Sequence, residues 1–400
     1  MLRPNFILTS LLVLLTLSSW AQIDATPTMT NVKYGPAPLQ VFDFFKTTAP
    51  GKNPVVIYFH GGGYQSGDKL LTGRQLVNMD LLRQQGISFI SANYRLALNT
   101  RVDTVLQECE RLIRYIKANQ EMFAVDTARI GVYGTSAGGG ITQWLLHNPQ
   151  RGNPNATDPL LRQDTRIRAG AHIVSQSTLD FAQWADIVGL SENWWDTYAF
   201  KDDFVLYKIT DRAQYDDPAI KELRAKLDLP KYIDATDPPM FYANDNVFLT
   251  PQTDQDVIHH PQHTKFLESV SKAKNHRHVA IFTNDGNALY DALIDFFCQE
   301  LSCRNVSVPV NEIKTPAVQV FPTINPRSVR LDPLLVYEPI SWTVYNTFGQ
   351  TMAQVHSAPG RFQQDFNDFL SSQRLYHPAG PRWMMISARG TRQTLKFIIQ

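Results

Sequence analysis

The stretch RIGVYGTSAGGG, residues 129–140, decides the fold. Its first half is an apolar run of the kind found in strands that are buried on both faces of a parallel sheet. Gly134-Thr135-Ser136-Ala137-Gly138 then fits the pattern G-x-S-x-G, and the apolar segment 141–146 predicts a helix directly after it. A serine in such a sharp turn has a strained backbone and needs small neighbours. The stretch therefore predicts a turn that presents Ser136 as a nucleophile; a glycine-rich turn with an incidental serine is the alternative.

Alternating strand and helix patterns surround this turn from residue 54 to residue 300. Apolar runs predict strands at 55–59, 87–94, 129–133, 170–174, 240–243 and 279–283. Apolar residues recur at helical spacing over 102–116, with Asn99 or Thr100 as the expected cap, and 288–298 predicts a closing helix. This alternation predicts an α/β fold with a doubly wound, mostly parallel sheet.

A second glycine-rich motif, His60-Gly61-Gly62-Gly63, directly follows the strand predicted at 55–59. Glycines at this point allow backbone amides to approach a substrate oxygen without an intervening side chain. Amide donors that face a tetrahedral oxyanion stabilise it by about 3 kcal/mol each. We therefore interpret 61–63 as an oxyanion loop and His60 as a structural hydrogen-bonding residue rather than a base.

The remaining segments suggest four further units. Residues 1–21 have the apolar core and the small-residue cleavage site of a signal peptide, with an uncleaved anchor as the alternative. The core, 22–303, carries an insertion at 176–236 that is rich in aromatic and acidic residues and forms either a pocket wall or a small helical core of its own. A Pro-rich linker, 304–322, leads to strand-like pieces with regular glycines at 323–400, which predict a small all-β, sandwich-like module.

Composition excludes some functions and leaves others open. A formal net charge of +1 does not provide the basic surface that nucleic acids require. None of the three cysteines has the spacing of a zinc site, and no other cofactor is expected. In an oxidising compartment Cys298 and Cys303 are close enough in sequence to pair, whereas Cys109 falls on the apolar face of a predicted helix.

The segments HGGGYQSGDK (60–69) and DTARIGVYGTSAGGG (126–140) resemble α/β-hydrolase esterases of the hormone-sensitive-lipase and acetyl-xylan or feruloyl-esterase type. The similarity covers residues 50–175 well and 236–300 weakly. By this resemblance, the amides of Gly61, Gly62 and Ala137 form the oxyanion hole, and no metal or organic cofactor is needed. The family's acidic residue follows the next-to-last strand, which implies Asp245; Asp237 precedes that strand and fits less well.

The catalytic histidine departs from the family pattern. The family places it after the last strand, where this chain reads Thr283-Asn284-Asp285-Gly286-Asn287. A serine hydroxyl needs a base within hydrogen-bond reach. We expect that base in the cluster His259-His260-Pro261-Gln262-His263, with His260 or His263 able to reach Ser136 as well as His259. The alternative is a broken triad.

The C-terminal module resembles the sorting domain of type IX secretion cargo. The matching pieces are Asn325-Pro326, the segment 344–350 and the closing strand-like segment 395–399. This resemblance implies a cell-surface or secreted protein that passes through the periplasm and contacts the type IX machinery. A small carbohydrate-binding sandwich is the alternative.

These patterns together predict a secreted serine carboxylic-ester hydrolase that forms an acyl-enzyme through Ser136. Secretion and the aromatic insertion favour acetyl or feruloyl groups of polysaccharides as substrates. The alternatives are a lipase or peptidase of the same fold, and a catalytically impaired relative that acts as a surface binding protein.

Overall fold

A computed structural model describes residues 25–246, 250–283 and 286–303, without the side chains of residues 286 and 287. Beyond residue 303 it describes only the backbone of six strands. The predicted signal peptide, most of the predicted linker and residues Asn284 and Asp285 lie outside the described residues.

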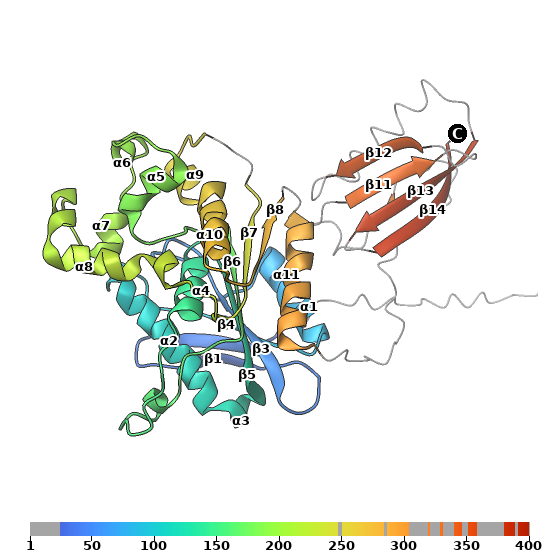
Figure 1. The fold of residues 1–400 in the computed structure, drawn as a ribbon. Helices are drawn as coiled ribbons and strands as arrows, with labels where there is room; N and C mark the ends of the chain where they lie inside the picture. The colour runs from blue at the N-terminus through green and yellow to red at the C-terminus, as the bar shows by residue number, and fades with distance from the viewer. Residues whose placement is uncertain are drawn as a thin grey trace, which may run out of the picture.

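An eight-stranded sheet forms the centre of the core, in the order β1-β2-β4-β3-β5-β6-β7-β8 (Figure 1). Strands β3 to β8 pair in parallel, whereas β1 and β2 are antiparallel additions at one edge. The strands are β1 (Met29–Lys33), β2 (Val41–Phe45), β3 (Asn53–Phe59), β4 (Ser88–Ala92), β5 (Val125–Thr135), β6 (Ala169–Ile173), β7 (Met240–Asn244) and β8 (His278–Phe282). The prediction of a mostly parallel sheet is confirmed.

Helices cover both faces of this sheet (Figure 1). One face packs against α2 (Val102–Ala118), α4 (Ala137–His147) and α10 (Pro261–Ala273), and the other against α1 (Gly73–Gln84) and α11 (Gly286–Leu301). Short helices α3 (Gln120–Phe123), η1 (Pro159–Arg162) and α9 (Asp254–Ile258) connect these elements. Alternate residues of β3 belong to the two separate apolar cores, as is typical of a strand buried on both faces.

The helical periodicity of 102–116 corresponds to α2, and its predicted cap is wrong. The N-cap residue is Arg101, with no capping hydrogen bond from a side chain. Arg101 instead pairs with Asp103 in the first turn, at 2.7 Å. A carboxylate near the helix N-terminus is favourable because it faces the positive end of the helix dipole.

The insertion after β6 consists of short helices around buried aromatic side chains. These are η2 (Phe181–Gln183), α5 (Trp184–Val188), α6 (Trp194–Thr197), α7 (Asp202–Tyr207), η3 (Arg212–Asp216), α8 (Pro218–Leu227) and η4 (Leu229–Tyr232). Trp184 stacks on Trp194 at 5.8 Å between ring centroids, and Phe200 contacts both rings. Much of its aromatic content therefore forms a small core of its own.

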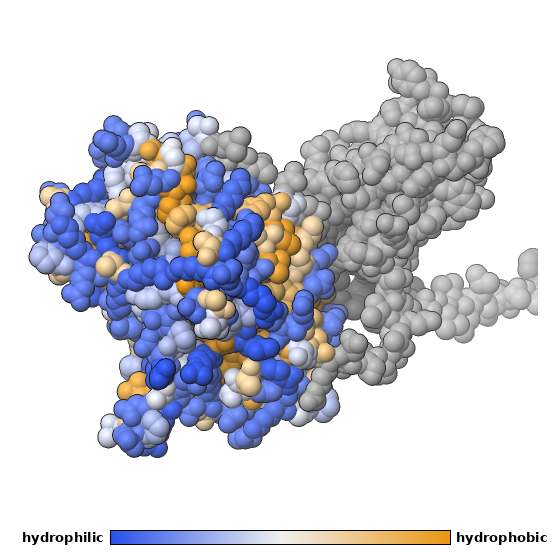
Figure 2. Space-filling model, in the orientation of Figure 1, coloured by the Kyte–Doolittle hydropathy of each residue, from blue (hydrophilic) through white to orange (hydrophobic). Residues whose placement is uncertain are grey.

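Surface polarity differs between regions of the viewed face. Figure 2 shows a mostly hydrophilic surface over the insertion and apolar surface over β8 and α11. Val279 and Phe282 of β8 are 43% and 39% exposed. Among the described residues, no helix has both the length and the apolar character required to cross a membrane.

The last described strands form two separate small sheets. β9 (Gln319–Val320) pairs with β10 (Val329–Arg330). β11 (Ile340–Tyr345), β12 (Thr351–Ser357), β13 (Gly380–Ala388) and β14 (Thr391–Ile399) form an antiparallel sheet in the order β12-β11-β13-β14. The strand-like pieces of this region, 341–345, 383–387 and 395–399, fall within β11, β13 and β14. A sorting role for this region stays a prediction.

Candidate active site

Ser136 occupies the turn between β5 and α4 with a strained backbone. Its φ of 53° and ψ of −122° lie outside the regions that residues other than glycine normally adopt. Its amide donates to the carbonyl of Ile173 on β6, at 3.1 Å. Gly138 allows the turn to approach β3, because a Cβ atom there would lie 2.0 Å from the Phe59 carbonyl oxygen. The turn thus directs the Ser136 hydroxyl into a pocket.

The predicted oxyanion loop lies beside this turn. A Cβ atom on Gly61 would be 3.3 Å from the Ser136 Cβ. Gly62 has a φ of 97°, and a Cβ atom there would lie 2.2 Å from the Ser66 carbonyl oxygen, so only glycine fits. Among the described residues, the amides of Gly61, Gly62 and Ala137 have no hydrogen-bond acceptor. Three unengaged amides next to the hydroxyl are the donors that an oxyanion requires.

His60 stabilises this loop and does not contact Ser136. Its Nδ1 is 2.8 Å from the Gly61 carbonyl oxygen, and its ring stacks on Tyr94 at 4.4 Å between centroids. The Tyr94 hydroxyl donates to the His60 carbonyl at 2.8 Å. His60 is therefore placed as a structural residue.

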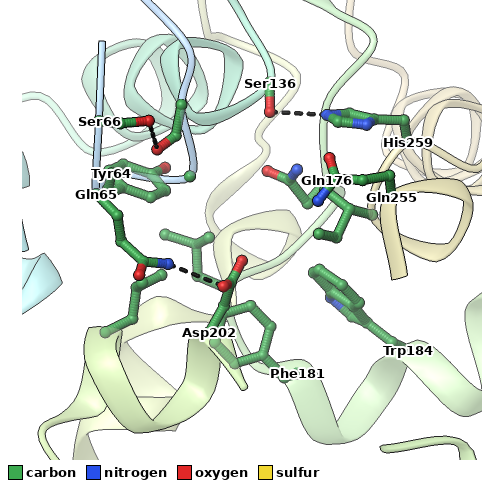
Figure 3. Close-up of a pocket in the computed structure, with 15 residues that line it drawn as sticks. Tyr64, Gln65, Ser66, Ser136, Gln176, Phe181, Trp184, Asp202, Gln255 and His259 are labelled. Carbon is green, nitrogen blue, oxygen red and sulfur yellow. Dashed lines mark hydrogen bonds between the residues drawn. The ribbon is translucent and has the colours of Figure 1, made fainter. Parts of the chain in front are cut away.

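His259 is the histidine that the structure brings to Ser136. Its Nε2 lies 2.9 Å from the Ser136 Oγ (Figure 3). The residue follows α9, and its backbone carbonyl accepts hydrogen bonds from Asn246 Nδ2 at 3.0 Å and Asn244 Nδ2 at 3.4 Å. These two asparagines at the end of β7 hold the backbone that carries the imidazole. The pattern Asn-x-Asn at the end of a predicted strand is the sequence signal that could have indicated this support for His259, and the sequence analysis did not identify it.

Three nearby carboxylates influence the imidazole of His259 through their charge and not through a hydrogen bond. Within the described residues no carboxylate hydrogen-bonds to it. Burial lowers the pKa of His259, while the Gln255 carbonyl and the charges of Asp245, Asp254 and Asp256 act in the opposite direction. A depressed pKa keeps the imidazole neutral at neutral pH, which is the form that can accept a proton.

The other two histidines of the predicted cluster, His260 and His263, make contacts away from Ser136. The His263 ring contacts Ser177 Oγ at 3.0 Å and the Val257 carbonyl at 3.1 Å, and burial lowers its pKa to about 3. His260 caps α10 by accepting from the Gln262 amide. Among the described residues, the imidazole that hydrogen-bonds to Ser136 Oγ is that of His259, and not that of either of these two.

Asp245 is half-buried after β7 and affects His259 through its charge, not through a hydrogen bond. Asp237 pairs with His147 at 2.6 Å. His147 belongs to α4, so the structure gives Asp237 a partner other than the imidazole of His259.

A pocket of about 450 Å³ opens in front of Ser136. Its walls come from the oxyanion loop, α9 and the insertion, which contributes Phe181, Trp184, Asp202 and Leu206. Figure 3 shows Ser136 and His259 at one end and Asp202, Phe181 and Trp184 at the other. The insertion is thus both a small aromatic core and a wall of this pocket. No cluster of three or more metal-binding side chains occurs among the described residues.

The family assignment follows from the sequence that builds this site. The profile of the family described as BD-FAE matches residues 42–255, more than half of the chain. The chain belongs to the BD-FAE family. The match includes the oxyanion loop and Ser136 and ends shortly before His259. His259, the histidine that lies next to Ser136, is therefore just beyond the matched segment of this BD-FAE protein.

Curated relatives match this BD-FAE protein over short segments. It is 26% identical to "Arylacetamide deacetylase" of Oryctolagus cuniculus over 32% of this chain and 33% of the relative. It is 34% identical to "Carboxylesterase NlhH" of Mycobacterium tuberculosis over 22% of this chain and 27% of the relative. The chain thus spans about a third or less of these two relatives.

Solved structures share the fold over a longer range. "Truncated form of carbohydrate esterase from gut microbiota" has a TM-score of 0.56 and 16% identity, and the match covers 70% of this chain and 98% of that one. "Crystal structure of acetyl ester-xyloside bifunctional hydrolase from Caldicellulosiruptor lactoaceticus" has a TM-score of 0.51 and 18% identity, over 65% and 87%. Together with the sheet order, these similarities show that the BD-FAE core has the α/β-hydrolase fold.

Proposed function

We propose that this protein is a serine carboxylic-ester hydrolase with Ser136 as nucleophile and His259 as general base. The contact of 2.9 Å between Ser136 Oγ and His259 Nε2, at a serine with positive φ, is the observation that carries the proposal. The name of the curated relative "Carboxylesterase NlhH" points to the same chemistry.

The proposed reaction has two halves. Ser136 Oγ attacks the ester carbonyl while His259 Nε2 accepts the hydroxyl proton, and the amides of Gly61, Gly62 and Ala137 stabilise the oxyanion. The tetrahedral intermediate collapses, the C–O bond to the alcohol breaks, and His259 returns the proton to the leaving alkoxide. Water then attacks the acyl-enzyme with His259 as base, which releases the acid and restores the Ser136 hydroxyl.

The pocket supports a small ester whose alcohol portion is a sugar and whose acyl portion is an acetyl or a feruloyl group. A volume of about 450 Å³ suits a small ligand, and Phe181 and Trp184, whose rings are almost fully buried, contribute apolar wall to it. Two of the structures with a similar fold are titled as a carbohydrate esterase and an acetyl ester hydrolase, although that similarity shows the fold alone.

Hydrolysis of 4-nitrophenyl acetate by the purified protein, followed by release of acetate from acetylated xylan, tests the proposal. Ser136→Ala should lower kcat by about 10⁶-fold, because a serine nucleophile has no substitute. Ser269→Ala, which changes an exposed serine of α10, is the matched control and should keep wild-type turnover. Turnover by Ser136→Ala at the wild-type rate would refute the assignment of Ser136 as the nucleophile. No turnover by the wild type would favour the surface binding protein.

We further propose export of the protein, with residues 1–21 as signal peptide and 323–400 as the type IX sorting module. The disulfide between Cys298 and Cys303 supports an oxidising compartment. Deletion of 323–400 should leave esterase activity intact in cell lysates while the protein stays inside the cell. Normal surface display of the truncated protein would instead favour the carbohydrate-binding module.

A further inference from the structure

The end of the pocket opposite Ser136 carries a carboxylate that has no cationic partner among the described residues. Asp202, the first residue of α7, accepts a hydrogen bond from Gln65 Nε2 through Oδ1, at 2.8 Å. Its Oδ2 would lie 3.7 Å from a Cβ atom on Gly63. Figure 3 shows this second oxygen directed into the pocket, towards the Ser136 end. Among the described residues, Asp202 makes no other hydrogen bond and no ion pair.

The adjacent acid shows what a structural carboxylate looks like in this insertion. Asp203 is fully buried and is bonded to Arg212 Nε at 2.9 Å and to the Tyr215 hydroxyl at 3.1 Å. The carboxylate of Asp203 therefore accepts hydrogen bonds from other residues of the insertion. Asp202, one position away, retains an unused acceptor oxygen that faces a cavity, which distinguishes a ligand-binding group from a structural one.

The rest of the lining fits a neutral donor and not an anion. The described lining residues include three glutamines, Gln65, Gln176 and Gln255, and no lysine or arginine. An anionic substrate group would therefore meet repulsion and no compensating cation. A hydroxyl group would satisfy the open acceptor without adding charge.

Gln65 connects this acceptor to the reaction centre. It belongs to the loop that also carries the amides of Gly61 and Gly62, and it holds Asp202 Oδ1 from that side. A substrate whose carbonyl oxygen occupies the oxyanion amides therefore extends its alcohol portion across a cavity closed by Asp202, Phe181 and Trp184. An apolar wall beside a carboxylate acceptor fits a sugar, whose ring carries C–H groups on its faces and hydroxyl groups at its edge.

We infer that Asp202 is a specificity-determining residue, which accepts a hydrogen bond from a free hydroxyl of the sugar that carries the ester. This inference rests on the proposed esterase function and deepens it, because it assigns neutral, hydroxyl-bearing sugar esters as the substrate class. Esters of acidic sugars are disfavoured by the same carboxylate.

The test compares two esters that differ only in hydroxyl groups: a mono-acetylated methyl xyloside, and the same ester with its remaining hydroxyls methylated. Wild-type kcat/KM should be about tenfold higher for the free-hydroxyl ester, the size expected for one hydrogen bond to a charged acceptor. Asp202→Leu should bring the two values within about twofold of each other. Asp202→Asn keeps an acceptor oxygen and should retain most of the preference. Asp216→Asn, an exposed acid of the insertion with a side chain 87% exposed, is the matched control for charge.

A binding experiment separates this inference from the proposed function. In the Ser136→Ala background, calorimetry should show that Asp202→Leu weakens binding of the free-hydroxyl ester about tenfold and leaves binding of the methylated ester unchanged. Hydrolysis of both esters with the same preference in wild type and Asp202→Leu would overturn the inference and leave the esterase proposal standing. Binding that depends on Asp202 without any turnover by the wild type would overturn the esterase proposal and support the sugar site.

Discussion

The nucleophile turn and the segment that carries the base differ in how they are encoded. The turn around Ser136 packs against Phe59 of β3 and Ile173 of β6, but the residues that this packing requires, a strained serine and close-packed glycines, all lie within one short motif. The base segment reaches Ser136 from 123 residues away, through a backbone carbonyl held by two asparagines. Local strain therefore leaves a readable motif, whereas a base positioned by tertiary contacts does not. Substitutions in the turn and in the base segment test the two halves of this comparison separately.

Apart from Ser136→Ala, the largest effect is expected at His259. Replacement by Gln keeps a polar side chain but removes the proton acceptor, so kcat/KM for 4-nitrophenyl acetate should fall by about 10⁶-fold. His263→Gln should lose far less activity per folded molecule, because its ring contacts Ser177 and Val257 instead of Ser136. Steady-state kinetics with active-site titration measures both. A larger loss in His263→Gln than in His259→Gln would move the base to His263.

The nucleophile turn is best tested at Gly138. Gly138→Ala forces a Cβ atom to 2.0 Å from the Phe59 carbonyl oxygen and should lower the free energy of unfolding by about 3 kcal/mol. The control is Gly51→Ala, where φ is also positive at 78° but no atom lies within 4 Å of the added Cβ. Its loss should be about 1 kcal/mol, from backbone strain alone. Similar losses in a denaturant titration would show that close approach does not dictate glycine at 138.

The base segment should be sensitive at Asn246. Asn246→Ala removes the 3.0 Å hydrogen bond to the His259 carbonyl, so the imidazole should be less often aligned with Ser136. We expect kcat to fall about tenfold with little change in KM, because a positioning residue affects chemistry more than binding. Asn155→Ala, at an exposed asparagine, is the control. A change in KM alone would show that Asn246 serves substrate binding.

The same difference between local motifs and tertiary contacts determines which parts of the fold and of the site can be predicted from the sequence. Apolar runs predict the strands β3 to β7, because strands buried on both faces carry few polar residues, and they also predict the partly exposed edge strand β8. They do not predict which histidine of the cluster 259–263 faces Ser136, since that depends on where α9 ends and α10 begins. Asp202 was equally hidden, because one acid in an acid-rich insertion becomes distinctive only when its neighbour Asp203 is seen paired with Arg212.

The smallest and most discriminating change is Asp245→Asn. If Asp245 were a hydrogen-bonded triad member, its loss would cost about 10⁴-fold in kcat. In the structure it acts on His259 only through its charge, which raises the pKa of the imidazole, as the charges of Asp254 and Asp256 also do. Its removal should therefore lower the pKa of His259 further, and activity at neutral pH should change by less than about threefold.

The pH profile of kcat/KM shows whether removal of the Asp245 charge lowers or raises the pKa of His259. Activity requires neutral His259, so the acidic limb rises through its pKa, which burial places below the ordinary value of 6.5. In Asp245→Asn this limb should move to lower pH, whereas Asp216→Asn, at an exposed acid of the insertion, should leave it in place. A limb that moves to higher pH, or a loss of about 10⁴-fold, would mean that Asp245 orients the imidazole directly during turnover. An unmoved limb would leave the Gln255 carbonyl and the two α9 acids as the groups that oppose the effect of burial on His259.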